Sequence, residues 1–299
     1  MKVAIIGNRF VGKTTLFRIL TNSASDEGIL TLYDKRLEEI ANIIKPKKIT
    51  HAYIEIYDNP KDLNLFDLLI LVIRNKKDLE DLKFKLILSD LKIVEKRIEN
   101  LKKRGNNKEL ELFEKLKNYL EQEQFLCSIK LEQDEELVLR GISFITTKPF
   151  IIVYNVFEGE EIEKLSESDY IISNLKLQEE TKHLNFEEQL EFLKLYGFEP
   201  INEILINKIK EKLDIILFFT AGEKEVRSWI LKNGKTIKEA AGKIHSDLEK
   251  GFVRAEVIHF EEFMKIKDLK LAKEKGLVRI EGKDYIVKDG DIVYIRASI

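Results

Sequence analysis

The segment GNRFVGKTT, residues 7–15, constrains the fold of this chain more than any other feature. It follows a short apolar, β-branched run and precedes apolar residues at helical spacing, so we expect a strand–loop–helix unit. Gly7 and Gly12 let the main chain curl so that amide N–H groups point at phosphate oxygens, while Lys13 supplies positive charge and Thr14 a hydroxyl for Mg²⁺. A strand–helix turn with a chance lysine is the alternative, and the context favours a phosphate-binding loop.

Two further segments carry groups that a nucleotide site needs. Asp58 ends the alternating stretch AYIEIYD and is placed to hold Mg²⁺ through water, although an ordinary strand-terminating acid gives the same pattern. Asn155 follows the apolar stretch FIIVY, where an Asn can contact a purine ring and brace the phosphate loop. Glu158 stands where an Asp usually reads guanine and is one methylene longer, which disfavours guanine; a loop Asn–Glu pair without function remains the alternative.

Composition limits the class of protein. The chain has 299 residues, 44% of them hydrophobic and 35% charged, with a formal net charge of −2, so global charge argues neither for nor against nucleic acid. The single cysteine, Cys127, excludes a disulfide framework within one chain, and the four histidines form no short-spaced pair that would indicate zinc. Because no apolar stretch reaches ~18–20 residues, we expect a soluble, cytoplasmic protein that does not bind membrane. We also expect a monomer and no binding to DNA.

The pattern of elements predicts three parts. Strand-like and helical segments alternate over residues 1–78 and 148–213, which indicates an α/β domain with a mostly parallel sheet. Residues 79–147 interrupt it with two long amphipathic segments joined at GNN (105–107), as in a helical hairpin. Residues 214–299 read as a small mixed sheet around one helix.

That single helix is expected over TIKEAAGKIHSDLEK, residues 236–250, where Thr236 and Glu239 form a capping box. Two basic segments, KPKK (45–48) and KKRGNNK (102–108), are candidates for contact with RNA phosphates. Solvated helix ends are the alternative, because isolated basic clusters are common in a lysine-rich chain.

Several stretches resemble the YchF subfamily of Obg-like P-loop ATPases. DKRLEEIANIIKPKKITHAYIEIYD, LILSDLKIVEKRIENLKK and TKPFIIVYNVFE resemble its G domain and helical insertion. FFTAGEKEVRSWILKNGKTIKEAAGKIHSDLEKGFVRAEVI and EGKDYIVKDGDIVYIR resemble its C-terminal TGS domain. The resemblance implies a P-loop G domain, an inserted helical hairpin and a β-grasp TGS domain, together with a preference for ATP over GTP and association with the ribosome or ribosomal RNA.

The expected nucleotide and metal contacts follow from the loop and from this resemblance. Thr14 and Asp58 are the expected Mg²⁺ contacts. The expected nucleotide-binding residues are Asn8, Arg9, Phe10, Val11, Gly12, Lys13, Thr14, Thr15, Asn155, Val156 and Glu158.

The chain also departs from the family pattern. Only twelve residues separate Thr21 from Asp34, where the family has a longer segment with a Mg²⁺-ligating threonine. The segment DNPKDL lacks the Asp-x-x-Gly of the second switch, no glycine lies between Gly28 and Gly105, and Phe10 replaces an asparagine. We therefore expect nucleotide binding with weak hydrolysis at most, or, as the alternative, a non-enzymatic ribosome- or RNA-binding module with a degenerate nucleotide site.

Overall fold

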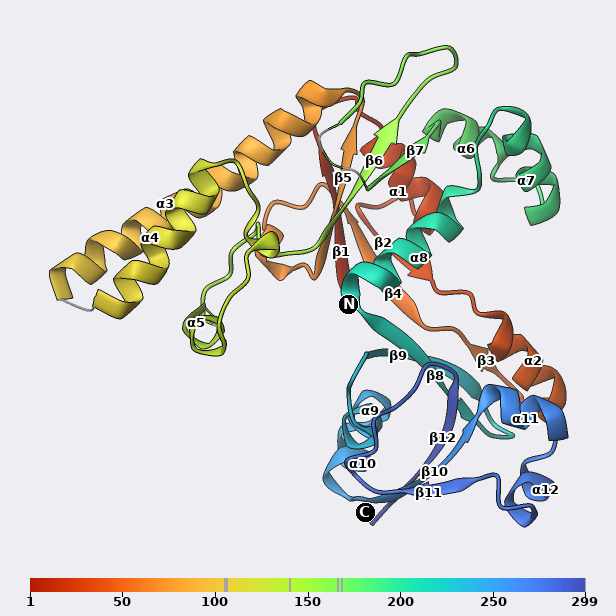
Figure 1. Cartoon of the computed structure of the whole chain (residues 1–299). Helices are drawn as coiled ribbons and strands as arrows, with labels where there is room; N and C mark the ends of the chain where they lie inside the picture. The colour runs from red at the N-terminus through yellow and green to blue at the C-terminus, as the bar shows by residue number, and fades with distance from the viewer. Residues whose placement is uncertain (105–106, 140, 166, 168, 299) are drawn as a thin grey trace. The chain divides into compact units, whose positions relative to one another are not determined.

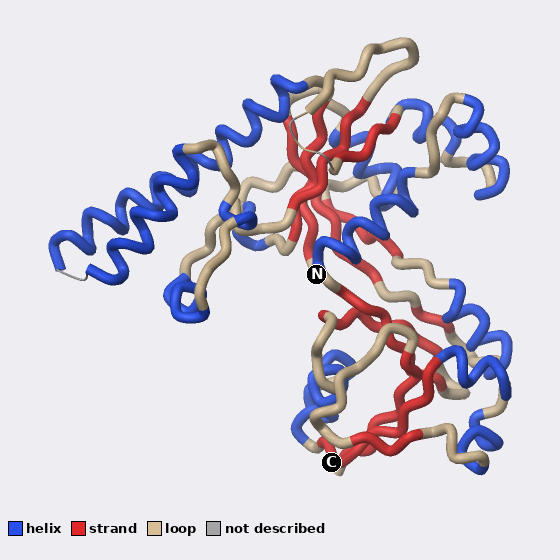
Figure 2. The backbone as a smooth tube through the Cα atoms, viewed as in Figure 1, coloured by secondary structure: helices blue, strands red, loops and turns tan. Residues whose placement is uncertain are grey.

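The chain folds into two compact units, each with its own sheet. The computed structural model describes all residues except 105–106, 140, 166, 168 and 299. One unit consists of Met1–Ile29 and Glu55–Lys212, and the other of Leu30–Ile54 and Leu213–Ile299. Figure 2 shows the strands of each sheet and the helices that cover them.

The first unit is built on a six-stranded sheet with the order β2-β4-β1-β5-β6-β7 (Figure 1). The pairs that join β4, β1, β5, β6 and β7 are all parallel. The strands are β1 (Lys2–Gly7), β2 (Glu27–Thr31), β4 (Tyr53–Asp58), β5 (Leu68–Ile73), β6 (Phe150–Asn155) and β7 (Tyr170–Ser173). Every residue of β5 is buried, as the unbroken apolar run predicts for a strand covered on both faces.

Helices of the first unit cover this sheet and form the predicted hairpin. They are α1 (Lys13–Thr21), α3 (Lys76–Arg104), α4 (Asn107–Glu121), α5 (Gln133–Leu139), α6 (Leu175–Thr181), α7 (Phe186–Leu195) and α8 (Ile201–Leu213). Figure 1 shows α4 alongside the C-terminal part of α3. Of the expected turn at GNN, residues 105 and 106 lie outside the described residues. Within the described part of the chain, no helix combines the length and apolarity needed to cross a bilayer.

A buried carboxylate ties the chain that returns from the hairpin to α3. Asp90 is fully buried and accepts hydrogen bonds from the main-chain N–H groups of Ile145 and Thr146, at 3.0 and 2.7 Å, and from the Thr146 hydroxyl at 2.7 Å. Burial raises the pKa of Asp90, and the three hydrogen bonds oppose that shift. One hydrophobic core continues from the sheet at Leu71 into the hairpin at Leu116, so the hairpin base is packed rather than hinged.

The link between β4 and β5 is unusually short for its topology. Both strands pair in parallel with β1, which lies between them, so the chain crosses over β1 within residues 59–67. Parallel crossovers generally need about a dozen residues or more and contain a helix. Here the link contains a single 3₁₀ turn, Leu63–Leu65, and is held down by the buried ring of Phe66.

The second unit is a six-stranded mixed sheet with the order β11-β10-β12-β8-β9-β3. Its strands are β3 (Ile49–Thr50), β8 (Ile215–Ala221), β9 (Val226–Lys232), β10 (Phe252–His259), β11 (Arg279–Glu281) and β12 (Asp291–Ala297). Its helices are α2 (Lys35–Ile44), α9 (Ile237–Ile244), α10 (Ser246–Lys250), α11 (Phe260–Ile266) and α12 (Leu269–Glu274). One apolar core joins the sheet to α2, α11 and α12, and a second joins it to α9.

The second unit includes a segment that the sequence pattern assigns elsewhere. The pattern places residues 1–78 in the G domain, whereas Leu30–Ile54 packs with the C-terminal residues. Leu37 and Ile40, on the apolar face of α2, share a core with Phe219 of β8. This packing joins residues far apart in the chain, which local patterns do not reveal. The three-part division otherwise remains a prediction.

The helix expected over residues 236–250 is two helices. The capping box of Thr236 and Glu239 is present and begins α9. His245 breaks the run because its main chain is extended, with φ −163° and ψ 141°, and its Nδ1 accepts a hydrogen bond from the Asp247 main-chain N–H. The expected fold class is confirmed: an α/β G-domain-like unit with a helical hairpin and a C-terminal β-grasp-like sheet.

Candidate functional site

The segment GNRFVGKTT forms the loop between β1 and α1, at the carboxyl edge of the sheet. Because β1 lies between β4 and β5, this edge is a point where strand order reverses, and such points form ligand crevices in open α/β sheets. A Cβ at Gly7 would lie 2.4 Å from the Val72 carbonyl oxygen. Gly12 has φ +103°, and its Cβ would lie 2.6 Å from Asn155 Nδ2. Both positions therefore require glycine.

Asn155 braces the loop from the carboxyl end of β6, two strands away from β1. Its buried side chain donates from Nδ2 to the Val11 carbonyl oxygen at 2.9 Å and accepts at Oδ1 from the Leu175 main-chain N–H at 3.1 Å. Val156 is also buried, and its N–H donates to the Ser173 carbonyl oxygen at 2.9 Å. Both residues are predicted from the distant NVFE segment. The structure places Asn155 against the phosphate loop, and Val156 against the end of β7.

Lys13 lies at the first position of α1 and is folded back onto the loop. Its ammonium donates to the Asn8 main-chain carbonyl oxygen at 2.6 Å. Burial lowers the pKa of Lys13, and the nearby Asp58 carboxylate opposes that change. Thr15, the next predicted contact, is half-buried in the first turn of α1.

Thr14 and Asp58, the predicted magnesium pair, lie in direct contact. The Thr14 hydroxyl donates to Asp58 Oδ2 at 2.6 Å, joining the start of α1 to the end of β4. The second carboxylate oxygen, Asp58 Oδ1, is buried and has no hydrogen-bond partner among the described residues. A buried carboxylate oxygen normally has a partner. A hydroxyl beside such an oxygen fits Mg²⁺, which prefers oxygen ligands and retains several waters.

Three predicted contacts project into solvent. Arg9 and Glu158 are exposed, and Phe10 is 98% exposed with φ +64°. A large side chain with positive φ is strained by about 1–3 kcal/mol, and such strain clusters at ligand sites. Arg74 follows the last residue of β5 and has no motif that would have predicted its place here; its guanidinium lies 3.7 Å from the ring centroid of the half-exposed Phe157.

Sequence reasoning also missed two partners of Asn8. The Asn8 side chain donates to Asp78 and accepts from Lys85, both on α3. Asn75 immediately precedes this helix, and its side chain accepts from the Asp78 N–H at 2.9 Å. This Asn-x-x-Asp spacing is a helix-start pattern visible in the sequence, whereas the contact of Asp78 with the loop depends on the fold.

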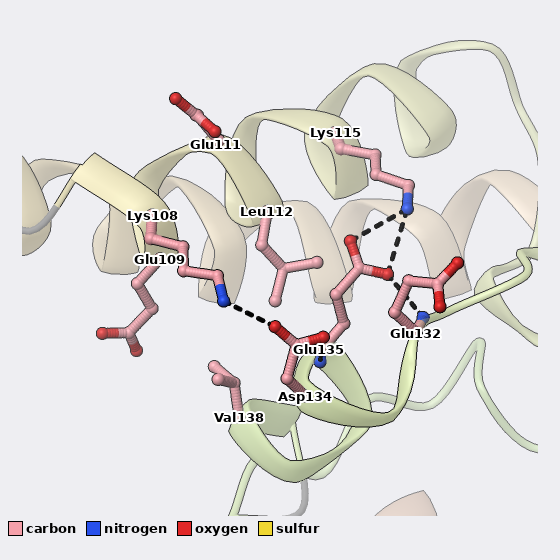
Figure 3. A pocket seen from close by; sticks show the side chains of 9 residues that line it. All are labelled: Lys108, Glu109, Glu111, Leu112, Lys115, Glu132, Asp134, Glu135 and Val138. Carbon is pink, nitrogen blue, oxygen red and sulfur yellow. Dashed lines mark hydrogen bonds and ion pairs between the residues drawn. The ribbon is translucent and has the colours of Figure 1, made fainter.

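The basic segment 102–108 is only partly available to a ligand. Lys108 is paired with Asp134 of α5 at 2.6 Å, and Lys102 with Glu114 at 3.4 Å. Figure 3 shows Lys108 and Lys115 of α4 facing Asp134 and Glu135 across an open cleft of about 510 Å³. These ion pairs raise the pKa of Lys108 and lower that of Asp134. Any RNA phosphate would therefore compete with carboxylates of α5 for these lysines.

Comparison with known proteins identifies relatives over the whole chain. A family model for the C-terminal domain of YchF-type GTPases, described as "Protein of unknown function (DUF933)", matches residues 215–298. The ribosome-binding ATPase YchF of Buchnera aphidicola subsp. Schizaphis graminum is 33% identical over 355 aligned positions that cover 98% of each chain. The ribosome-binding ATPase YchF of Bacillus subtilis is 29% identical and covers 100% of both chains. The first alignment exceeds the 299 residues of this chain by 56 positions, so that relative contains segments that this chain lacks.

Two solved structures share the fold. The structure of the Schizosaccharomyces pombe YchF GTPase superimposes with a TM-score of 0.88 at 24% identity, covering 99% of this chain and 97% of the other. A GTP-binding protein from Pyrococcus horikoshii superimposes with a TM-score of 0.61 at 17% identity, covering 100% of both chains.

Replacing Asn155 by alanine should destabilise the first unit. The Val11 carbonyl and the Leu175 N–H would lose their partner in a buried place, which should lower the free energy of unfolding by about 3 kcal/mol. Urea unfolding followed by circular dichroism measures the change. Asn100→Ala, on the exposed face of α3, is the matched control and should stay within about 0.5 kcal/mol of wild type. An Asn155→Ala variant as stable as this control would contradict the bracing role.

Proposed function

Because the chain belongs to the YchF family of ribosome-binding ATPases, we propose that it binds Mg·ATP at the loop of residues 7–15 and associates with the ribosome, with slow hydrolysis or none. The observation that carries the nucleotide part is the complete phosphate loop, braced by Asn155 and adjoining the Thr14–Asp58 pair. In this proposal residues 214–299 form a TGS-like domain, onto which Leu30–Ile54 packs.

The residues of the loop have distinct roles in binding. Main-chain N–H groups of the loop and of the first turn of α1 would hold the phosphates, helped by the positive end of the helix. Lys13 would exchange the Asn8 carbonyl oxygen for phosphate oxygens. Thr14 and Asp58 would hold Mg²⁺, which supplies positive charge beside the phosphates when bound.

Adenine is the base that the site fits better. The polar groups of the Asn155 side chain are already used in two hydrogen bonds within the protein, and the adjacent Val156 is buried. Glu158 is exposed, and its longer side chain does not match the position from which an aspartate reads guanine. ATP is therefore the preferred nucleotide and GTP the weaker one.

Hydrolysis should be slow because the groups that orient water and sense the γ-phosphate are missing. The link of residues 59–67 contains no glycine, and the segment between α1 and α2 contains only the short strand β2. Loss of one positioned transition-state donor typically costs ~10²–10³ in rate. Loss of two or three leaves binding possible and turnover close to background.

Calorimetric titration of nucleotide-free protein tests the nucleotide part directly. With Mg²⁺ present, ATP and a non-hydrolysable ATP analogue should bind more tightly than GTP, and ADP should bind about as tightly as ATP because the γ-phosphate sensor is missing. Lys13→Ala should lose nucleotide binding, whereas Lys232→Ala, an exposed lysine at the end of β9, should retain it. Failure of every nucleotide to bind would favour the degenerate-site alternative, and tighter GTP than ATP would overturn the base assignment.

Removal of the metal tests whether Asp58 contributes to ATP binding through Mg²⁺. In Mg²⁺, Asp58→Asn should weaken ATP binding by about 10–100-fold, the typical cost of disturbing a supporting metal contact. In EDTA, the variant and wild type should bind ATP equally, because the metal is absent from both. An Asp58→Asn variant that is equally impaired with and without Mg²⁺ would show that Asp58 acts only on the loop structure.

The alternative function, a ribosome- or RNA-binding module with a degenerate nucleotide site, is favoured by the lysines at the hairpin. Lys103 is exposed, and Lys102 and Lys108 form solvent-exposed ion pairs, which contribute little stability and can be exchanged for phosphate. This part of the proposal needs no γ-phosphate sensor, and so it would survive a failure to bind nucleotide.

Changes on α5 and the hairpin should shift RNA affinity in opposite directions. Lys102→Ala combined with Lys103→Ala should weaken binding to ribosomal RNA and reduce the slope of log K against log salt by about 1 for each phosphate that is no longer neutralised. Asp134→Asn with Glu135→Gln should strengthen binding, because these carboxylates compete with phosphate. Glu187→Gln with Glu191→Gln on α7 removes the same charge as a matched control. If both double variants strengthened RNA binding equally, the effect of the α5 changes would come from the change in net charge and not from competition with phosphate.

A further inference from the structure

We propose that Asn8 couples the phosphate loop to α3, so that nucleotide binding is transmitted to the helical hairpin through an Asn8–Asp78–Lys85 network. This inference rests on the proposed nucleotide binding. It assigns to the loop a connection that passes directly to α3 and does not involve the link between β4 and β5.

The network joins the loop to the first turns of α3 by two side-chain hydrogen bonds. Asn8 Nδ2 donates to Asp78 Oδ1 at 2.9 Å, and Lys85 Nζ donates to Asn8 Oδ1 at 2.9 Å. Asp78 and Lys85 are seven residues apart, about two helical turns, so they lie on one face of the helix. A single loop side chain is thus held at both of its polar ends by the same helix.

Asp78 is itself fixed to the end of β5 and the start of α3. Its Oδ2 accepts from the Arg74 main-chain N–H at 2.9 Å, and its own N–H donates to Asn75 Oδ1 at 2.9 Å. A shift of Asn8 cannot be absorbed by free rotation of Asp78. A shift of Asn8 that keeps its hydrogen bond to Asp78 therefore acts on the helix start.

The main chain of Asn8 carries the contact that a nucleotide would change. Lys13 donates to the Asn8 carbonyl oxygen at 2.6 Å, and a bound phosphate would draw the Lys13 ammonium away from it. The main-chain carbonyl oxygen of Asn8 therefore contacts Lys13, while its side-chain amide contacts α3. Binding of nucleotide would break the contact of Lys13 with the Asn8 carbonyl oxygen. It would thereby alter the position of the Asn8 side chain against Asp78 and Lys85.

The helix that receives this signal reaches the hairpin end. α3 runs for 29 residues from Lys76 to Arg104 and packs along α4. Its buried Leu82 and Leu86 belong to the same core as the sheet and the hairpin. A change in the stability of the first turns of α3 can therefore be transmitted along this packed helix toward the basic segment 102–108.

The route fits a chain whose β4–β5 link is short and lacks glycine. Residues 59–67 cross over β1 with one 3₁₀ turn, and Phe66 anchors them in the core. Such a link has little room to change conformation. The contact between Asn8 and α3 is the alternative connection that the structure supplies.

Amide hydrogen exchange of the full chain tests the coupling. In wild type, saturating Mg·ATP should slow exchange in the first turns of α3 by about fivefold or more, the lower end of typical coupling between sites. Lys85→Met should still bind ATP, because Lys13 and the main-chain N–H groups of the loop are kept, and should lose most of the slowing. Lys92→Met, seven residues further along α3 and exposed, should behave as wild type.

Each outcome decides between the two levels of the proposal. If ATP binds wild type and exchange in α3 is unchanged, or if Lys85→Met keeps the full response, the coupling is overturned while the nucleotide function stands. If Lys85→Met and Lys92→Met lose the response equally, the effect belongs to α3 in general and the network is refuted. If ATP does not bind wild type, the proposed nucleotide function fails and the coupling fails with it.

Discussion

The two hydrogen bonds of the Asn155 side chain hold the site together. They connect the loop before α1 with the turn between β7 and α6, and they do so in a place that water does not reach. Gly12 can approach this amide only because it has no Cβ. The carboxyl ends of β1, β6 and β7 are therefore fixed relative to one another before any ligand arrives, and the geometry of the phosphate loop depends on that fixed frame.

This frame is complete although the link beside it, residues 59–67, is short. The link between β4 and β5 is short and contains no glycine, whereas the loop, its Asn155 brace and the Thr14–Asp58 contact are present. Under the proposed function, such a protein would hold a nucleotide rather than cycle through its hydrolysis. The position of Asn8 against α3 offers a way for occupancy alone to matter.

The sequence allowed much of the fold and the centre of the site to be predicted. The glycine spacing, the apolar run of β5 and the capping box at Thr236 each report a local requirement, and each was recognised correctly. The packing of α2 against β8, the break at His245 and the network around Asn8 were missed because they depend on contacts or conformations that no short window encodes. The roles of the individual site residues remain predictions until ligands are bound.

The packing of α2 and β3 in the second unit has a consequence for how this protein can be divided. The sheet of that unit ends at β3, which belongs to a segment of chain far upstream, and one of its two cores is closed by α2. A fragment that begins near residue 214 would lack both, leaving β9 as an open edge and Phe219 without the helix that covers it. Residues 214–299 therefore do not form the whole of this unit. A chimera that exchanges the C-terminal domain between relatives would have to include Leu30–Ile54 as well.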